Sequence, residues 1–120
     1  MENNLEKLEQ LVINWADEKG ILAKATPLTQ FSKTKEEVEE LGLALEAQEK
    51  GWETFINGKD KRVGTRDEII DGLGDAVVTL IIGAKMQGLT LQQCLQSAYD
   101  VISKRKGEIR NGVFVKSEDL

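Results

Sequence analysis

The segment DEIIDGLGDAVVTLII, residues 67–82, decides the fold because it predicts a helix that is apolar on most sides and acidic on one face. At 100° per residue, Glu68, Asp71 and Asp75 fall within about 60° of one another. Apolar residues cover the remaining directions, so this helix is expected at the centre of the protein with neighbours on most sides. Its carboxylates should then be partly buried.

The rest of the chain repeats apolar residues at steps of three and four, which is the helical period. Thr26 and Pro27 are typical of a helix start, and glycines follow the expected helix ends. The predicted helices cover residues 4–18, 27–50, 66–87 and 91–106. Residues 51–64 are expected to form a loop, and the tail 111–120 a turn with a short extended piece. We predict one all-α domain over residues 1–120, resembling a four-helix bundle.

Two of these helix starts carry capping-box patterns. Thr65 is followed three residues later by Glu68, and Thr90 by Gln93. In such a box the threonine and the acid or amide satisfy backbone N–H groups at the start of the helix. We therefore expect the third helix to begin after Thr65 and the fourth after Thr90.

Composition excludes several classes of function. The 120 residues carry a net charge of −5, one cysteine and no histidine, so nucleic acid is not expected as a partner and catalysis by histidine is excluded. An internal disulfide framework is excluded as well. The acidic N-terminus is unlike a leader, and the longest apolar run is far shorter than a membrane span of about 20 residues. A soluble, cytoplasmic protein without a membrane partner is the expectation.

A second acidic cluster lies on the predicted helix 27–50. Glu37 and Glu40 lie just beside its apolar stripe, and packing this helix antiparallel against helix 66–87 would bring them opposite Asp71 and Asp75. That many carboxylates cannot all stay ionised in a small volume without cations. Lysine or arginine could supply the positive charge, but Mg²⁺ commonly binds a few carboxylates together with substrate phosphates. The pattern favours an enzyme of phosphate chemistry.

These residues resemble the MazG-like all-α nucleoside triphosphate pyrophosphohydrolases, whose signature is Glu-Glu-x-x-Glu followed, after a gap, by Glu-x-x-Asp. EEVEE supplies Glu36, Glu37 and Glu40 in that spacing, and EIID supplies Glu68 and Asp71. KTKEEVEELGLAL is similar to the family's first acidic helix and DEIIDGLGDAVVTL to its second. The resemblance covers roughly residues 10–115, and the ending AYDVISKRKGEIRNGVFVKSEDL is similar to a phage and prophage-type branch.

The chain departs from the family pattern at one position. Many members have Glu-Leu-Gly-Asp in the second motif, where this chain has GLGD and therefore Gly72 in place of the glutamate. Asp71 and Asp75 lie four residues apart on one helix face, so they could hold one metal ion together. We rank them above Glu68 as ligands.

The resemblance implies hydrolysis of a nucleoside or deoxynucleoside triphosphate to the monophosphate and pyrophosphate, with Mg²⁺ as cofactor and Mn²⁺ as the alternative. The metal ligands would come from Glu37, Glu40, Glu68, Asp71 and Asp75. Glu36 or Glu37 would hold or deprotonate the attacking water, and Glu36 is preferred because it lies on the less buried flank. By position, the candidate phosphate contacts are Lys33, Lys104 and Arg105, and the candidate base or sugar contacts are Gln30 and Asn111.

Helices that are apolar on nearly all sides are difficult to cover within one small bundle. Self-association is therefore expected, and the family resemblance implies a homodimer or a dimer of dimers. Two alternatives to the main hypothesis stay open. One is a related hydrolase that acts on phosphoribosyl-ATP or a modified nucleotide, and the other is a non-catalytic acidic helical module that binds a protein or sequesters divalent ions.

Overall fold

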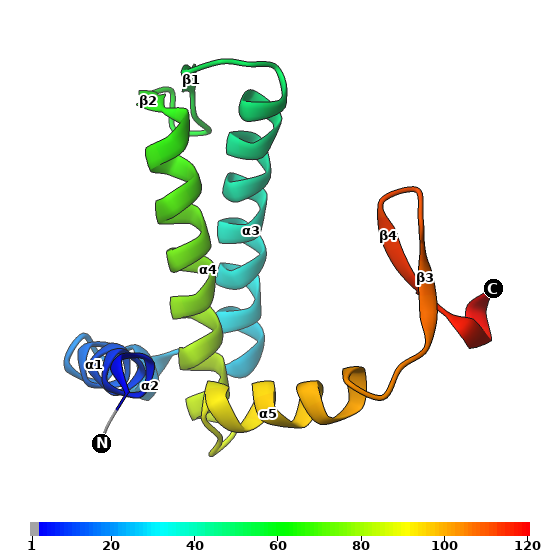
Figure 1. The fold of residues 1–120 in the computed structure, drawn as a ribbon. Coiled ribbons are helices and arrows are strands. Elements are labelled where there is room, and N and C mark those ends of the chain that lie inside the picture. The colour runs from blue at the N-terminus through cyan, green and yellow to red at the C-terminus, as the bar shows by residue number, and fades with distance from the viewer. Residues whose placement is uncertain (1–2) are drawn as a thin grey trace.

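The computed structural model describes residues 3–120, which form a mainly helical chain with two small β-hairpins (Figure 1). The mainly-α prediction is confirmed. The helices are α1 (Asn4–Glu18), α2 (Ile21–Lys24), α3 (Pro27–Glu49), α4 (Thr65–Met86) and α5 (Leu91–Ile102). The strands are β1 (Thr54–Ile56), β2 (Arg62–Gly64), β3 (Gly107–Arg110) and β4 (Val113–Lys116), and a 3-10 turn covers Ser117–Asp119.

Local capping explains most of the helix starts. The Thr26 side chain accepts a hydrogen bond from the backbone N–H of Thr29, and Thr90 with Gln93 forms the predicted capping box. The box predicted for Thr65 is wrong, because α4 already includes Thr65 and the residue before it makes no side-chain cap. The Thr65 hydroxyl instead donates to the Trp52 carbonyl oxygen at 2.6 Å, which ties the start of α4 to the start of the first β-hairpin.

Helices α3 and α4 form an antiparallel pair joined by the β1–β2 hairpin (Figure 1). Small residues allow the two helices to approach closely. A Cβ added to Gly72 of α4 would lie only 3.1–3.3 Å from three atoms of Leu41, including its Cα. The buried cluster beside this contact consists of Ala44, Ala47, Phe55 and Ile69. The antiparallel packing expected from the two acidic helices is therefore present.

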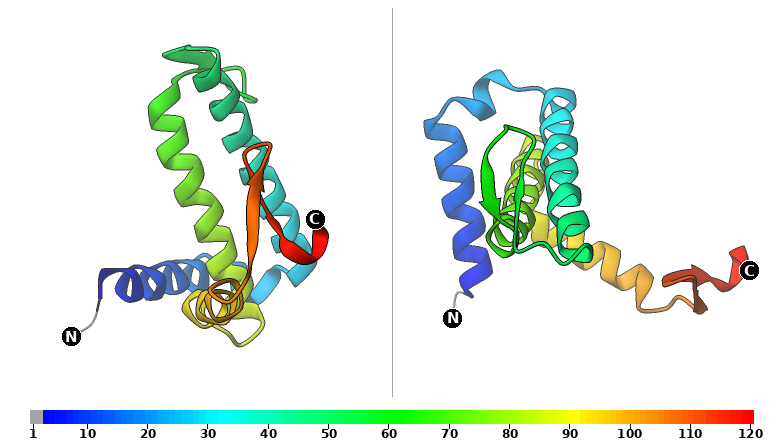
Figure 2. Two further views of the ribbon diagram at one scale, coloured as in Figure 1. Left: turned by 45° about the vertical axis from the view of Figure 1, so that its right-hand side comes forward. Right: turned by 90° about the horizontal axis from the view of Figure 1, so that it is seen from above.

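Helices α1 and α5 lie across one end of this pair instead of alongside it (Figures 1 and 2). Buried Glu9 of α1 fixes the junction, because its carboxylate accepts the Leu91 backbone N–H at 2.6 Å and the Gln92 side-chain amide at 3.3 Å. A carboxylate at a helix N-terminus is electrostatically favourable. Within residues 3–120, only α3 and α4 therefore lie side by side over their lengths. A four-helix bundle would need further helices from outside this chain.

Two segments differ from expectation. The predicted loop 51–64 contains the antiparallel β1–β2 hairpin, because Phe55 points inward and packs on the cluster of small residues that α3 and α4 leave uncovered. The fourth helix ends at Ile102 instead of near Lys106, because the chain turns there to enter the β3–β4 hairpin. That hairpin closes through Asn111 and Gly112, both with positive φ, as two-residue hairpin turns require.

Helix α4 has neighbours on fewer sides than expected. It contacts α1, α3, α5 and β2, yet four of its large apolar residues stay exposed on one side: Ile70, Leu73, Val77 and Leu80. Over residues 3–120, no helix is both long enough and apolar enough to cross a membrane.

The close contact at Gly72 predicts a difference between two neighbouring glycines of α4. Gly74→Ala should raise the free energy of unfolding by about 1 kcal/mol, because alanine is the better helix former and a Cβ there meets nothing within 4 Å. Gly72→Ala should be at least about 1 kcal/mol less stable than Gly74→Ala, because the backbone of α3 must move away. Urea denaturation at one protein concentration measures both, and equal stabilisation would contradict close packing at Gly72.

Candidate functional site

An open cleft of about 290 Å³ lies between α3, α4 and the tip of the β1–β2 hairpin. Its acidic wall comes from the two long helices, and its basic wall comes from the hairpin tip. The polar residues that line it are Glu40 of α3, Glu68, Asp71 and Asp75 of α4, and Asn57, Lys59 and Lys61 of the hairpin. The antiparallel pairing of α3 with α4 therefore brings four of the predicted acids to one cleft.

The acids repel one another in this arrangement. Burial, and next the charge of Glu37, raises the pKa of Glu40 above its ordinary value. Partial desolvation, followed by the charges of Glu37 and Asp71, raises the pKa of Asp75, although Asp75 and Asp71 are more exposed than expected. Glu37 is itself only 9 % exposed, so its charge is poorly screened. The carboxylates of α3 and α4 thus form one electrostatic unit that favours a bound cation.

Two lysines partly compensate this charge. Lys33 lies 3.3 Å from a carboxylate oxygen of Glu36 and 3.3 Å from one of Glu37. Burial acts to lower the pKa of Lys33, but its hydrogen bonds to these two acids, together with their negative charges, outweigh burial and raise it. Lys59 lowers the pKa of both Glu40 and Asp75 through its charge, although it makes no ion pair with either of them within the described chain.

The hairpin tip is a defined turn that faces the acids. The Asn57 Oδ1 atom accepts hydrogen bonds from the backbone N–H groups of Lys59 at 2.9 Å and Lys61 at 3.0 Å. Asp60 completes the turn with a φ of 59°. Sequence reasoning missed these residues as part of the site, because it treated residues 51–64 as a loop. The stretch NGKDK could have predicted the hairpin tip as part of the site, because it is a turn sequence with two lysines between the two acidic helices.

The donor set fits Mg²⁺ in chemistry, because every candidate ligand is a carboxylate oxygen. In the arrangement described for residues 3–120, no three acidic or cysteine side chains converge on a point that could hold a metal ion. Binding would therefore require at least one of these carboxylates to change rotamer. Glu37, Glu40, Asp71 and Asp75 are close enough to influence one another electrostatically, whereas Glu68 only lines the cleft.

The other predicted site residues lie outside the cleft of a single chain. Gln30 is buried and its side-chain amide donates to the Thr79 carbonyl oxygen at 3.1 Å, which joins α3 to α4. Glu36 lies on the exposed flank of α3 and is half exposed. Lys104 and Arg105 follow α5, and Asn111 lies in the turn of the second hairpin, in the part of the chain that stands away from α3 and α4 (Figure 1).

Comparisons with protein-family models, with curated proteins and with solved structures found no match to this chain. The interpretation of the cleft therefore depends on its own residues and on the motif resemblance.

The raised pKa of Asp75 predicts how stability depends on pH without metal. The native protein holds this proton to a higher pH than the unfolded chain, so stability falls as the pH rises from the ordinary aspartate pKa through the raised one. In buffer with a chelator, Asp75→Asn should therefore unfold at a higher temperature than the wild type at pH 7. This gain should disappear well below the ordinary aspartate pKa of about 3.9, where Asp75 is protonated in both the native and the unfolded protein.

Asp67→Asn is the control for this experiment, because Asp67 lies in the exposed first turn of the same helix. Removing a negative charge there should lower the unfolding temperature slightly at pH 7. A wild type more stable than Asp75→Asn at pH 7 in chelator would show that Asp75 is not under electrostatic strain.

Proposed function

We propose that this protein is a Mg²⁺-dependent hydrolase that cleaves nucleoside or deoxynucleoside triphosphates to the nucleoside monophosphate and pyrophosphate. A cytoplasmic location and self-association are parts of the same proposal. The observation that carries it is the cleft in which the carboxylates of α3 and α4 face two lysines of the β1–β2 hairpin. A phosphate chain with a divalent cation needs both kinds of partner, because the acids bind the cation and the lysines bind the phosphate oxygens.

The carboxylates have distinct tasks in this proposal. Glu37, Glu40, Asp71 and Asp75 are the main candidates to hold the cation, with Glu68 at the edge of the set. When bound, Mg²⁺ would activate water as a Lewis acid and neutralise charge on the phosphate oxygens. Glu36 and Glu37 are the candidates to orient the water and accept its proton. Glu37 is favoured over Glu36 by position, since its charge acts strongly on both Glu40 and Asp75 whereas Glu36 is half exposed.

The lysines orient the phosphates. Lys59 and Lys61 line the cleft and have no other anion partner within 4.0 Å among the described residues. Lys33 is already paired with Glu36 and Glu37, so it serves better to position Glu37 than to bind substrate. The two hairpin lysines therefore replace Lys33 as the first candidates for phosphate contact. Lys104, Arg105 and Asn111 do not line the cleft, so the hairpin lysines rank above them as substrate contacts.

Two other functions remain candidates. A related pyrophosphohydrolase for phosphoribosyl-ATP or a modified nucleotide would use the same acidic wall with a different base pocket. A non-catalytic module would bind divalent ions through the same acids without turnover. An assay of all canonical nucleotides, scoring monophosphate plus pyrophosphate against diphosphate plus phosphate, separates these functions from the main proposal.

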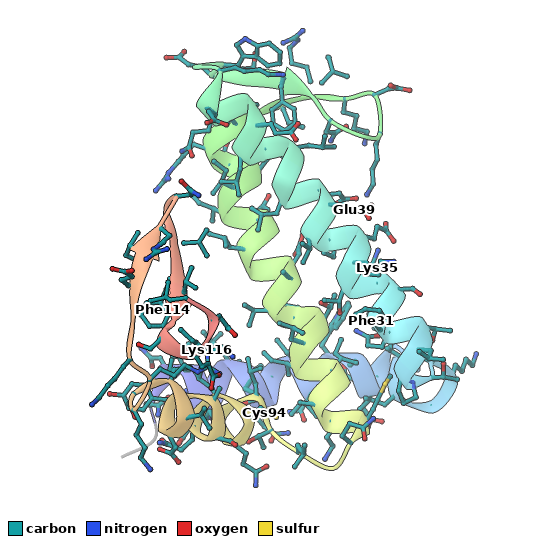
Figure 3. The ribbon with its side chains drawn as sticks, turned by 90° about the vertical axis from the view of Figure 1, so that its right-hand side faces the viewer. Phe31, Lys35, Glu39, Cys94, Phe114 and Lys116 are labelled. Atoms are coloured by element: carbon teal, nitrogen blue, oxygen red, sulfur yellow. The ribbon has the colours of Figure 1, made fainter. Side chains whose placement is uncertain are left out.

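Glu40→Gln should abolish most of the activity in that assay. The change keeps the size of the side chain but removes a charge from the proposed cation site, so we expect kcat to fall at least about 100-fold. Glu39→Gln is the matched control, because Glu39 is exposed on another side of α3 (Figure 3). It should retain activity within about twofold. Mg²⁺ should also raise the unfolding temperature of the wild type and of Glu39→Gln, but much less that of Glu40→Gln.

If none of the nucleotides is hydrolysed in the presence of Mg²⁺ or Mn²⁺, the catalytic proposal is contradicted. If Mg²⁺ still stabilised the wild type in that case, the non-catalytic cation-binding function would be supported.

Lys59→Ala should raise KM about tenfold and change kcat less, because a charge-assisted hydrogen bond to a phosphate contributes about 1.5–3 kcal/mol. Lys61→Ala is expected to act in the same direction. Lys7→Ala, an exposed lysine of α1 outside the cleft, is the control and should leave KM unchanged. Steady-state kinetics on the best substrate measures all three, and an unchanged KM in both hairpin variants would exclude the hairpin from phosphate binding.

A further inference from the structure

The chain exposes far more surface than a compact monomer of its size. Its accessible surface is 9186 Å², whereas a folded monomer of 13.3 kDa exposes about 6,500 Å². The radius of gyration is 17.2 Å against about 14 Å for a compact chain of this length. No large side chain is fully buried in the part of the chain that the structure describes. The excess of about 2,700 Å² is of the size that one subunit buries in an obligate assembly.

Part of this excess is the apolar face of the α3–α4 pair, which lies opposite the acidic cleft. On helical wheels, Phe31, Val38 and Leu45 of α3 lie on the flank away from Glu36 and Glu40. On α4, Ile70, Leu73, Val77 and Leu80 lie on the flank away from Glu68, Asp71 and Asp75. All seven apolar side chains are exposed. Their spacings of seven, and of three, four and three, are those of helices that pack against other helices.

The other part is the arm, residues 91–120, which consists of α5, the β3–β4 hairpin and the final turn. The β3–β4 hairpin of the arm stands apart from the α3–α4 pair (Figures 1 and 3). Every residue from 92 to 114 is exposed. An isolated two-stranded hairpin is marginally stable in water, so this hairpin needs a surface to pack on.

The arm offers its own apolar surface. Leu95, Tyr99 and Ile102 form an exposed stripe on α5. Ile109 pairs directly with Phe114 across the hairpin, so both side chains lie on one side of it, and they are 67 % and 47 % exposed. The capping of α5 by Glu9 holds the base of the arm in place.

We propose that the arm of one copy packs on the apolar α3–α4 face of a second copy, and that the exchange is reciprocal. A second copy is the occupant that covers both surfaces at once, because each copy has one arm and one apolar face. Such an isologous contact closes as a dimer and leaves neither surface in water. The acidic cleft lies on the opposite face of the pair and stays open. This inference specifies the self-association that belongs to the proposed function, and it does not depend on the enzymatic activity.

The test uses the full-length chain with Phe114 replaced by the photo-crosslinking amino acid p-benzoylphenylalanine, which preserves an aromatic ring at the exposed position labelled in Figure 3. Unlabelled and ¹⁵N-labelled protein are mixed, allowed to exchange subunits and irradiated. We expect crosslinked peptides that join the hairpin of one isotope to α3 or α4 of the other, and a dimer or a multiple of it in sedimentation equilibrium. A monomeric mass, crosslinks confined to one copy, or crosslinks only between two arms would overturn the proposal.

Charge substitutions give an independent test of the same contact. Ile109→Glu on the arm and Val77→Glu on α4 should each weaken association at least about 100-fold, because each buries an unpaired carboxylate in the proposed interface. Ile56→Glu is the matched control, since Ile56 is 51 % exposed on β1, in the other hairpin. If Ile56→Glu weakened association as much as Ile109→Glu does, the assigned surface would be contradicted.

Discussion

The close packing of α4 against α3 at Gly72 is the constraint on which the rest of the structure depends. Because Gly72 has no Cβ, the backbone of α4 can lie against Leu41 of α3, and the small residues nearby bury Phe55 of the first hairpin. A side chain in place of Gly72 would meet the facing helix, whereas Asp71 and Asp75 lie beside this contact and line the cleft.

The same pairing gives the chain two faces of opposite character. On one face, burial and the charge of Glu37 raise the pKa values of Glu40 and Asp75, and the lysines of the hairpin tip lie opposite the acids across the cleft. The repulsion between these acids is unfavourable by itself, and bound cations would relieve it. On the other face, apolar side chains remain in water. A second subunit would cover that surface in the proposed assembly, which would place the proposed cation site and the proposed subunit contact on separate sides of one helix pair.

Helix positions were largely predictable because their signals are local. Asn3, Thr26 and Thr90 cap helices within three residues of themselves, and the period of apolar residues marks the lengths. The acidic residues of the cleft were predictable for the same reason, since two helices and an antiparallel turn bring them together. Thr65 was mispredicted because its hydroxyl bonds to Trp52, thirteen residues earlier. The first hairpin was missed because Phe55 is buried against residues of both long helices, which are far from it in the sequence.

The sequence by itself determined the helices, the acid-bearing faces and the excess of apolar surface, because periodicity, capping and charge are properties of neighbouring residues. Only the tertiary structure decided that Lys59 and Lys61 face the acids, that Gln30 joins α3 to α4, and that the arm stands away from the helix pair. These features depend on contacts between residues far apart in the chain, and on how closely two helices can approach when one of them has a glycine at the point of contact.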